Sequence, residues 1–120
     1  MLIAALILNT AILAPVIWAL STGSPYMDAA FGPETDARRI LTCVYGAIAV
    51  VSAALIALHS VGHPWAIQMT LALFGVQVSY KLATVWVVGS SNPVVMTNVL
   101  VIVVQIAAVL VTLRAGLLAA

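Results

Sequence analysis

The chain has 120 residues, of which 65% are hydrophobic and only 6% are charged, and its formal net charge is +1. Soluble domains carry about a quarter charged residues, so a soluble globule of this composition would lack the polar surface that water requires. The small net charge, without a basic cluster, also excludes a nucleic-acid-binding surface. The composition therefore predicts an integral membrane protein, surrounded by the lipid bilayer.

The charged residues are clustered, and their positions limit the number of membrane spans. Five of the seven fall between Asp28 and Arg39, whereas Lys81 stands inside an apolar run and Arg114 lies near the C-terminus. A helix needs roughly 20 apolar residues to cross the hydrocarbon core, so this chain holds at most four spans. We therefore expect one all-α domain, residues 1–120, made of four transmembrane helices.

The first predicted span covers residues 2–20. It contains Pro15, which a membrane helix tolerates where neighbouring groups satisfy the freed carbonyl. No Lys or Arg precedes Arg38, so the basic start of a cleaved signal peptide is missing and we expect this helix to be retained. After a break rich in Ser, Gly and Pro, a short interfacial helix is predicted at residues 25–31, with its aromatic side chains at the headgroup boundary.

The second predicted span covers residues 33–60. Pro33 suits the first helical position, and Glu34 and Asp36 lie in the first turn, where the helix dipole favours negative charge. At 1.5 Å per residue this helix is about 40 Å long, which exceeds the roughly 30 Å hydrocarbon core. Its first two turns are therefore predicted to project beyond the apolar layer.

The third and fourth predicted spans cover residues 65–88 and 93–114. Trp65 and Trp86 mark the two lipid interfaces of the third span, because tryptophan favours the headgroup level. Pro93 again suits the first position of a helix. The connections between these spans are short, and short connections force neighbouring helices to be antiparallel. The predicted architecture is therefore an up-down-up-down four-helix transmembrane bundle.

The few positive charges give this bundle a direction in the membrane. Arg38, Arg39 and Lys81 lie toward the side of the first loop, whereas Arg114 is the only positive side chain on the side of the termini. The positive-inside rule then places the first loop in the cytoplasm and both termini outside. In this arrangement Arg38 and Arg39 are predicted to contact the lipid interface.

Lys81 is the most informative polar residue of the spans. Its Cα is expected roughly 10 Å inside the end of its helix, and its side chain leans toward the helix N-terminus, deeper into the bilayer. It therefore needs a partner. Glu34 and Asp36 begin the second span at the same face, so we predict an interhelical ion pair, with a ligand or partner contact as the alternative. Gln77 and Tyr80 lie beside Lys81 and belong to the same candidate site.

Other polar side chains add little chemistry that the sequence alone can assign. Asn9, Asn98 and Gln105 could line a small pocket, but interhelical hydrogen bonds are the favoured interpretation. His59 and His63 have the i, i+4 spacing of metal ligands, yet the sequence breaks the helix there and offers no further ligand nearby. We predict no catalytic residues, no metal site and no evident cofactor.

Two stretches resemble small bacterial four-span proteins related to the DoxX-like group. The first is residues 32–41 together with 44–47, and the second is residues 78–82 together with 92–95 and Asn98. The resemblance implies a bacterial inner-membrane, multi-pass four-helix bundle. Relatives in this group are sometimes linked to quinone or thiol redox complexes.

Three functions are expected from these observations. The leading one is a non-catalytic accessory subunit of a larger membrane complex, respiratory or photosynthetic, because the spans leave almost no soluble mass for a catalytic set. The alternative is a small homo-oligomeric transporter or channel that uses Lys81. The third is the quinone- or lipid-associated redox role that the resemblance implies, although Cys43 is the only cysteine and no CxxC is present.

Overall fold

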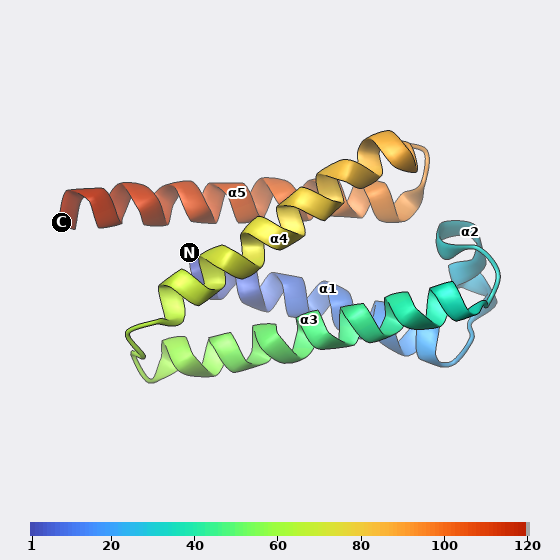
Figure 1. Ribbon diagram of the computed structural model, residues 1–120, viewed down its shortest axis with the longest axis horizontal. Helices are drawn as coiled ribbons and strands as arrows, with labels where there is room; N and C mark the ends of the chain where they lie inside the picture. The colour runs from blue at the N-terminus through green and yellow to red at the C-terminus, as the bar shows by residue number, and fades with distance from the viewer. Residues whose placement is uncertain (120) are drawn as a thin grey trace.

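The computed structural model describes residues 1–119, and the side chains of residues 1–116, as an all-helical chain without strands in that range (Figure 1). Four long helices are joined by short connections and by one pair of helical turns. The elements are α1 (Leu2–Ser21), the 3₁₀ turn η1 (Pro25–Met27), α2 (Asp28–Phe31), α3 (Asp36–Ser60), α4 (Ala66–Val87) and α5 (Pro93–Ala119). All four long helices are long and apolar enough to cross a membrane, which confirms the prediction of four such segments.

The start of α3 differs from the sequence prediction. The helix begins at Asp36 rather than Pro33, because Thr35 acts as its N-cap. Thr35 has an extended backbone (φ −130°, ψ 171°), and its hydroxyl accepts a hydrogen bond from the Arg38 backbone N–H at 3.3 Å. This bond satisfies one of the N–H groups that a helix start leaves without a partner. Just before it, Gly32 ends α2 with φ 76°, a conformation that favours glycine.

The four long helices pack as a ring in which α1 lies beside α3, α3 beside α4, α4 beside α5, and α5 beside α1. Two apolar clusters hold the ring together. One cluster, at the end that holds the N-terminus, contains Leu2, Ala5, Leu6, Leu55, Phe74 and Ala108. The other, at the opposite end, is built on Leu13, Leu20 and Tyr45. Buried polar side chains, which include Asn9 on α1 and Ser52 on α3, form a polar layer between the two clusters.

The interior of the bundle contains polar side chains besides the apolar clusters, and its outer surface is largely apolar. Eight polar or charged side chains are buried, namely Asn9, Arg38, Ser52, Thr70, Gln77, Lys81, Asn98 and Gln105. Large apolar side chains such as Val50, Val76 and Leu110 are exposed on the outer helix faces. In water this distribution would be unfavourable, whereas in a bilayer it places apolar side chains against lipid. The arrangement is therefore compatible with a multi-pass membrane protein.

The segment between α1 and α3 is fixed to one end of the bundle by Arg38. The guanidinium Nη1 donates to Asp28 Oδ1 at 2.5 Å and to the Gly32 carbonyl at 2.8 Å, and Nη2 donates to the Ser24 carbonyl at 3.3 Å. The loop before α5 lies at the same end, since Asn92 Nδ2 donates to the Ala30 carbonyl at 2.8 Å. The turns η1 and α2 therefore cover the end of the bundle opposite the N-terminus, where α4 ends and α5 begins (Figure 1).

A candidate ligand cavity around Lys81

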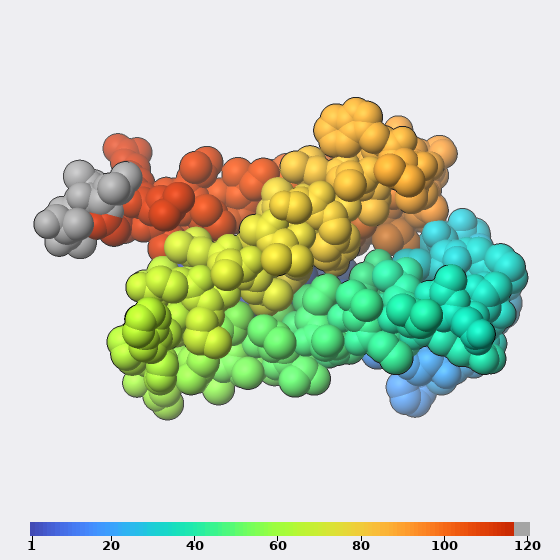
Figure 2. Space-filling model, viewed as in Figure 1, coloured from blue at the N-terminus to red at the C-terminus, as the bar shows by residue number. Residues whose placement is uncertain are grey.

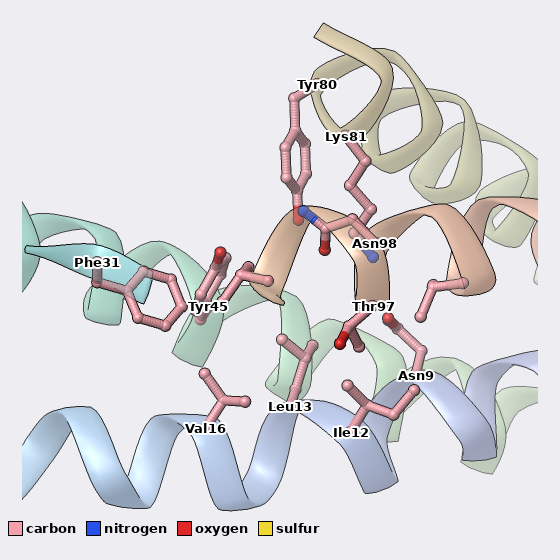
Figure 3. A pocket seen from close by; sticks show the side chains of 12 residues that line it. Asn9, Ile12, Leu13, Val16, Phe31, Tyr45, Tyr80, Lys81, Thr97 and Asn98 are labelled. Atoms are coloured by element: carbon pink, nitrogen blue, oxygen red, sulfur yellow. The ribbon is translucent and has the colours of Figure 1, made fainter. Parts of the chain in front are cut away.

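A cavity of about 70 Å³ lies within the bundle beside the second apolar cluster, whose Leu13 and Tyr45 form part of its wall. Side chains from α1, α2, α3, α4 and α5 contribute to its wall (Figure 3). The lining residues are Asn9, Ile12, Leu13, Val16, Phe31, Tyr45, Tyr80, Lys81, Val94, Thr97, Asn98 and Val101. In Figure 3 the polar ends of Asn9, Tyr80, Lys81 and Asn98 converge on this space.

Lys81 reaches the cavity because it lies on the buried stripe of α4. Thr70, Phe74, Gln77 and Lys81 are separated by four, three and four residues, so the helical period places them on one face. Lys81 is only 4% exposed. Its side chain leans one turn back toward the helix N-terminus, where Nζ donates to Gln77 Oε1 at 3.2 Å. A primary ammonium has three N–H donors, so this contact leaves two for other partners.

Gln77 connects Lys81 to α5. Its Oε1 accepts from Lys81 Nζ and also from Gln105 Nε2, at 2.9 Å, and both glutamines are almost completely buried. Gln77 Nε2 and Gln105 Oε1 have no partner among the described residues, and neither has the buried hydroxyl of Tyr80. Buried polar groups normally find a partner, and among these three residues Tyr80 lines the cavity, so its hydroxyl indicates a place where water or a ligand binds.

Asn98 on α5 and Asn9 on α1 complete the polar part of the wall. In Figure 3 Asn98 lies beside Tyr80 and Lys81, and Asn9 faces them from α1. Asn9 is 1% exposed, and its Nδ2 donates to Ser52 Oγ on α3 at 3.3 Å, which leaves the amide oxygen for the cavity. Asn98 is also buried, and its side chain contributes both a donor and an acceptor. The sequence prediction favoured simple interhelical hydrogen bonds for these residues. The structure gives Asn9 such a bond and also places both residues on the cavity wall.

The predicted ion pair between Lys81 and Glu34 or Asp36 is not formed in the structure. Both acids lie instead beside Arg39, whose Nε is 3.5 Å from Glu34 Oε1 and whose Nη1 is 3.6 Å from Asp36 Oδ1. The side chain of Asp36, the first residue of α3, is 94% exposed. The third acid of the chain, Asp28, contacts Arg38. No carboxylate of the described side chains therefore neutralises Lys81.

A second and larger void, about 270 Å³, adjoins the first toward the covered end of the bundle. The two voids share five lining residues, namely Phe31, Tyr45, Tyr80, Val94 and Asn98. The rings of Phe31 and Tyr45 meet edge to face, with centroids 6.0 Å apart and an interplanar angle of 73°. Figure 2 shows the molecular surface hollowed between the orange part of α4 and the cyan and green start of α3. The larger void is therefore mainly aromatic and apolar.

The four residues predicted at the lipid interface have different surroundings. Arg38 is buried, which corrects the prediction, because the η1–α2 segment folds over its side chain and supplies three acceptors. Arg39 is exposed, as are Trp65 and Trp86. Trp65 precedes α4 and Trp86 lies in its last turn, so the two mark the ends of that helix.

Two aromatic residues of the site, Tyr45 and Phe31, were not predicted from the sequence. Tyr45 had a detectable signal, because Arg38, Tyr45 and Ser52 are seven residues apart and form the buried stripe of α3. Phe31 had none, since its position depends on how the η1–α2 segment folds back over the bundle end. Its place on the wall of both voids follows only from the tertiary structure.

His59 and His63 have separate roles in the structure. Thr70 Oγ1 donates to the Ala66 carbonyl at 2.8 Å, so at its 2.9 Å contact with His59 Nε2 it is the acceptor and the imidazole is the donor. This bond links α3 to α4. His63 is exposed in the connecting loop, where Nδ1 accepts the Trp65 backbone N–H at 3.2 Å. Within the described part of the chain no group of three His, Cys, Asp or Glu side chains could hold a metal ion.

No protein-family model, curated protein or solved structure matches this chain. The class of protein is therefore stated from the fold and the site alone. The chain is a small all-helical protein with four apolar helices of membrane-spanning length. Its particular feature is an internal cavity with one lysine and several amide and hydroxyl groups on the wall.

Proposed function

We propose that this chain is an up-down-up-down transmembrane bundle that binds a small anion at Lys81, as a solute-binding protein of the transporter or channel class. Successive long helices run in alternate directions in Figure 1, which supports the up-down order. The apolar exterior, together with the polar side chains buried inside the bundle, supports a position within a bilayer. The bacterial plasma membrane, with the first loop in the cytoplasm, is part of the same proposal.

The observation that carries the proposal is the absence of an acid beside a buried lysine. An isolated charge in a low-dielectric interior is strongly unfavourable, so intramembrane lysines are usually paired or take part in ligand binding. The three carboxylates of the chain belong to the cluster that contacts Arg38 and Arg39. Lys81 instead has one neutral acceptor, Gln77, and faces a cavity. A bound anion supplies the missing negative charge.

Equilibrium binding to the purified protein in lipid nanodiscs tests this function. The probes are radiolabelled acetate, chloride and inorganic phosphate, each compared with empty nanodiscs. The protein is expected to retain at least one probe, and Lys81→Met is expected to abolish that binding because it removes the charge but keeps the length of the side chain. Arg114→Met removes an exposed positive charge outside the cavity and serves as the matched control.

Two results would contradict the proposal. One is that none of the probes, and no organic acid offered in the same format, binds above the level of the empty nanodiscs. The other is that Lys81→Met and Arg114→Met lower binding equally, since this would assign the effect to general charge rather than to the cavity. The variant Lys81→Arg distinguishes an effect of general charge from binding in the cavity, because it keeps the positive charge but carries it on a larger, planar group.

An accessory subunit of a larger membrane complex is the second candidate, and the outer face of α4 favours it. Ala72, Gly75, Ser79 and Ala83 are exposed on this face at helical spacing, and no neighbouring atom lies within 4 Å of the position of a Gly75 side chain. Small residues at this spacing let membrane helices approach closely. Pull-down in mild detergent should then recover a stoichiometric partner, and Gly75→Leu should release it. Recovery of this chain alone would contradict an accessory role.

The quinone- or lipid-associated redox role implied by the DoxX-like resemblance stays a prediction of the sequence. Cys43, the one cysteine of the chain, is exposed and lies outside the cavity wall. A thiol redox role would therefore need a second cysteine from another protein. Unchanged binding by a Cys43→Ser variant is expected for the anion site, which does not use this thiol.

A further inference from the structure

We infer that the anion is an aromatic monocarboxylate, of the size of phenylacetate, with its carboxylate at Lys81 and its ring in the larger void beside Phe31, Tyr45 and Tyr80. This inference deepens the proposed function and rests on it. Its basis is that Lys81 lines only the smaller void, whereas Phe31, Tyr45 and Tyr80 lie on the wall common to both voids and mostly apolar side chains complete the larger one. The space at Lys81 is the polar part of the joined voids, and the larger void beside the three rings is the aromatic part. The shared residues Tyr80 and Asn98 place the two parts in direct continuity.

The polar part suits a single negative charge with two acceptor oxygens. Lys81 has two N–H donors without a protein partner. The Tyr80 hydroxyl also lacks a partner, and the Asn98 side chain adds an amide donor. A carboxylate accepts several such bonds, and its charge offsets that of Lys81. These donors come from α4 and α5, so binding also joins the two helices.

The charge balance excludes a dianion as the best ligand. Lys81 is the only Lys or Arg on the wall of either void. A phosphate monoester would bring a second negative charge into the same low-dielectric space, with no further cation to offset it. A neutral ligand would leave Lys81 without a counter-charge. A monoanion alone gives a neutral pair.

The aromatic part suits a ring. Phe31, Tyr45 and Tyr80 line it together with five apolar and three polar side chains, namely Ala30, Leu41, Val88, Val94 and Val95, and Thr84, Asn92 and Asn98. Aromatic rings favour edge-to-face and offset contacts, and Phe31 and Tyr45 already meet edge to face. The larger void, about 270 Å³, exceeds the roughly 150 Å³ apolar cavity that admits benzene in an engineered protein, so its volume is sufficient for a phenyl group.

The position of Phe31 places one wall of the larger void under the η1–α2 segment. Phe31 ends α2, and the η1–α2 segment is held over the bundle end by Arg38 and by the bond from Asn92 to the Ala30 carbonyl. The ring of a bound acid therefore lies beneath a segment fixed by four hydrogen bonds from two side chains. A short acid such as acetate, bound at Lys81, would not reach the aromatic part, so the side chains there would make no contact with it.

Binding of a matched series of compounds to the full chain in nanodiscs tests the inference. The series is phenylacetate, its neutral isostere phenylacetamide, acetate and octanoate. Phenylacetate is expected to bind about tenfold or more tightly than acetate, because the ring is buried against three aromatic side chains. It is also expected to bind more tightly than phenylacetamide and octanoate. Lys81→Met should abolish phenylacetate binding.

A pair of aromatic substitutions locates the ring. Phe31→Ala is expected to weaken phenylacetate binding at least fivefold and to weaken acetate binding much less. Trp86→Ala removes an exposed ring outside both voids and should change neither. Circular dichroism and monodisperse elution establish that each variant is folded, and Phe31→Leu provides a milder second variant of the same position.

Distinct outcomes overturn the inference and the proposed function. Equal affinity for acetate and phenylacetate, or no effect of both Phe31 variants, would overturn the aromatic ligand and keep anion binding at Lys81. Tighter binding of octanoate would also overturn it and would indicate an aliphatic acid from the lipid phase. Lys81-independent binding of every acid would remove the proposed function as well.

Discussion

Lys81 and Gln77 lie one turn apart on α4 and are joined by a hydrogen bond of 3.2 Å between Nζ and Oε1 inside the bundle. The same oxygen accepts Gln105 Nε2 from α5 at 2.9 Å. One amide oxygen therefore positions the buried ammonium and also connects two helices. This arrangement leaves Lys81 directed at the cavity without any carboxylate nearby, and it makes Gln77 the first residue to test.

Replacement of Gln77 by leucine is expected to destabilise the protein by about 1–2 kcal/mol, because two buried donors lose their acceptor while apolar volume is kept. Unfolding by sodium dodecyl sulfate from mild-detergent micelles measures the change. Gln68→Leu is the matched control, since Gln68 is exposed near the start of α4. Equal stability of the two variants would contradict a structural role for the Gln77 acceptor.

The bond between Asn9 and Ser52 predicts a measurable coupling between α1 and α3. Its length is 3.3 Å and both side chains are buried. A double-mutant cycle of Asn9→Ala and Ser52→Ala should give a coupling of about 0.6 kcal/mol, the average for side-chain hydrogen bonds in a membrane bundle. The same unfolding assay applies. Additive effects of the two substitutions would show that the bond contributes nothing.

Arg38 is expected to hold the η1–α2 segment over the bundle end. Arg38→Met removes three hydrogen bonds, to Asp28, Gly32 and Ser24, and should lower stability by at least about 1.5 kcal/mol. Hydrogen exchange should rise in residues 24–32 and remain unchanged in the middle of α5. Arg39→Met is the control, because Arg39 is exposed and its two contacts are long. Protection of residues 24–32 in the Arg38→Met variant would contradict this role.

The sequence predicts those features of the fold that local contacts decide, and it predicts poorly those that long-range contacts decide. Four apolar segments of sufficient length were readable directly, because lipid requires them. The start of α3 was placed at Pro33 because proline suits a first turn, but the side chain of Thr35 provides a cap that proline lacks. The helix therefore begins at Asp36, three residues later than predicted, where the Thr35 hydroxyl caps it.

The candidate site was predicted only in part, because some of its contacts are local and others are long-range. Lys81, Gln77 and Tyr80 were identified because they interrupt an apolar run, and all three surround the Lys81 cavity or its hydrogen bonds. The partner of Lys81 was predicted wrongly, since nearness of Glu34 in the topology did not reveal the competing contact with Arg39. Burial of Arg38 depends on carbonyl groups up to fourteen residues away, and no local pattern indicates those.

The orientation in the membrane is tested by cysteine labelling in a Cys43→Ser background, which removes the one native thiol. Ser91→Cys and His63→Cys place single thiols in the connections before α5 and before α4. In intact bacterial cells or spheroplasts, an impermeant maleimide should label the His63→Cys variant and not the Ser91→Cys variant. The reverse pattern would contradict the first loop being cytoplasmic, because Asn92 ties the loop before α5 to the same end as Ala30.

The most direct test of the account is a structure of the protein in lipid or detergent with 4-bromophenylacetate, with the bromine located by its anomalous scattering. The account predicts one bromine peak in the larger void, among Phe31, Tyr45 and Tyr80, with carboxylate density within hydrogen-bond distance of Lys81 Nζ. The peak should be lost in the Lys81→Met variant. A cavity that contains only water at saturating ligand, or a bromine peak confined to the exposed Arg39 cluster, would contradict it.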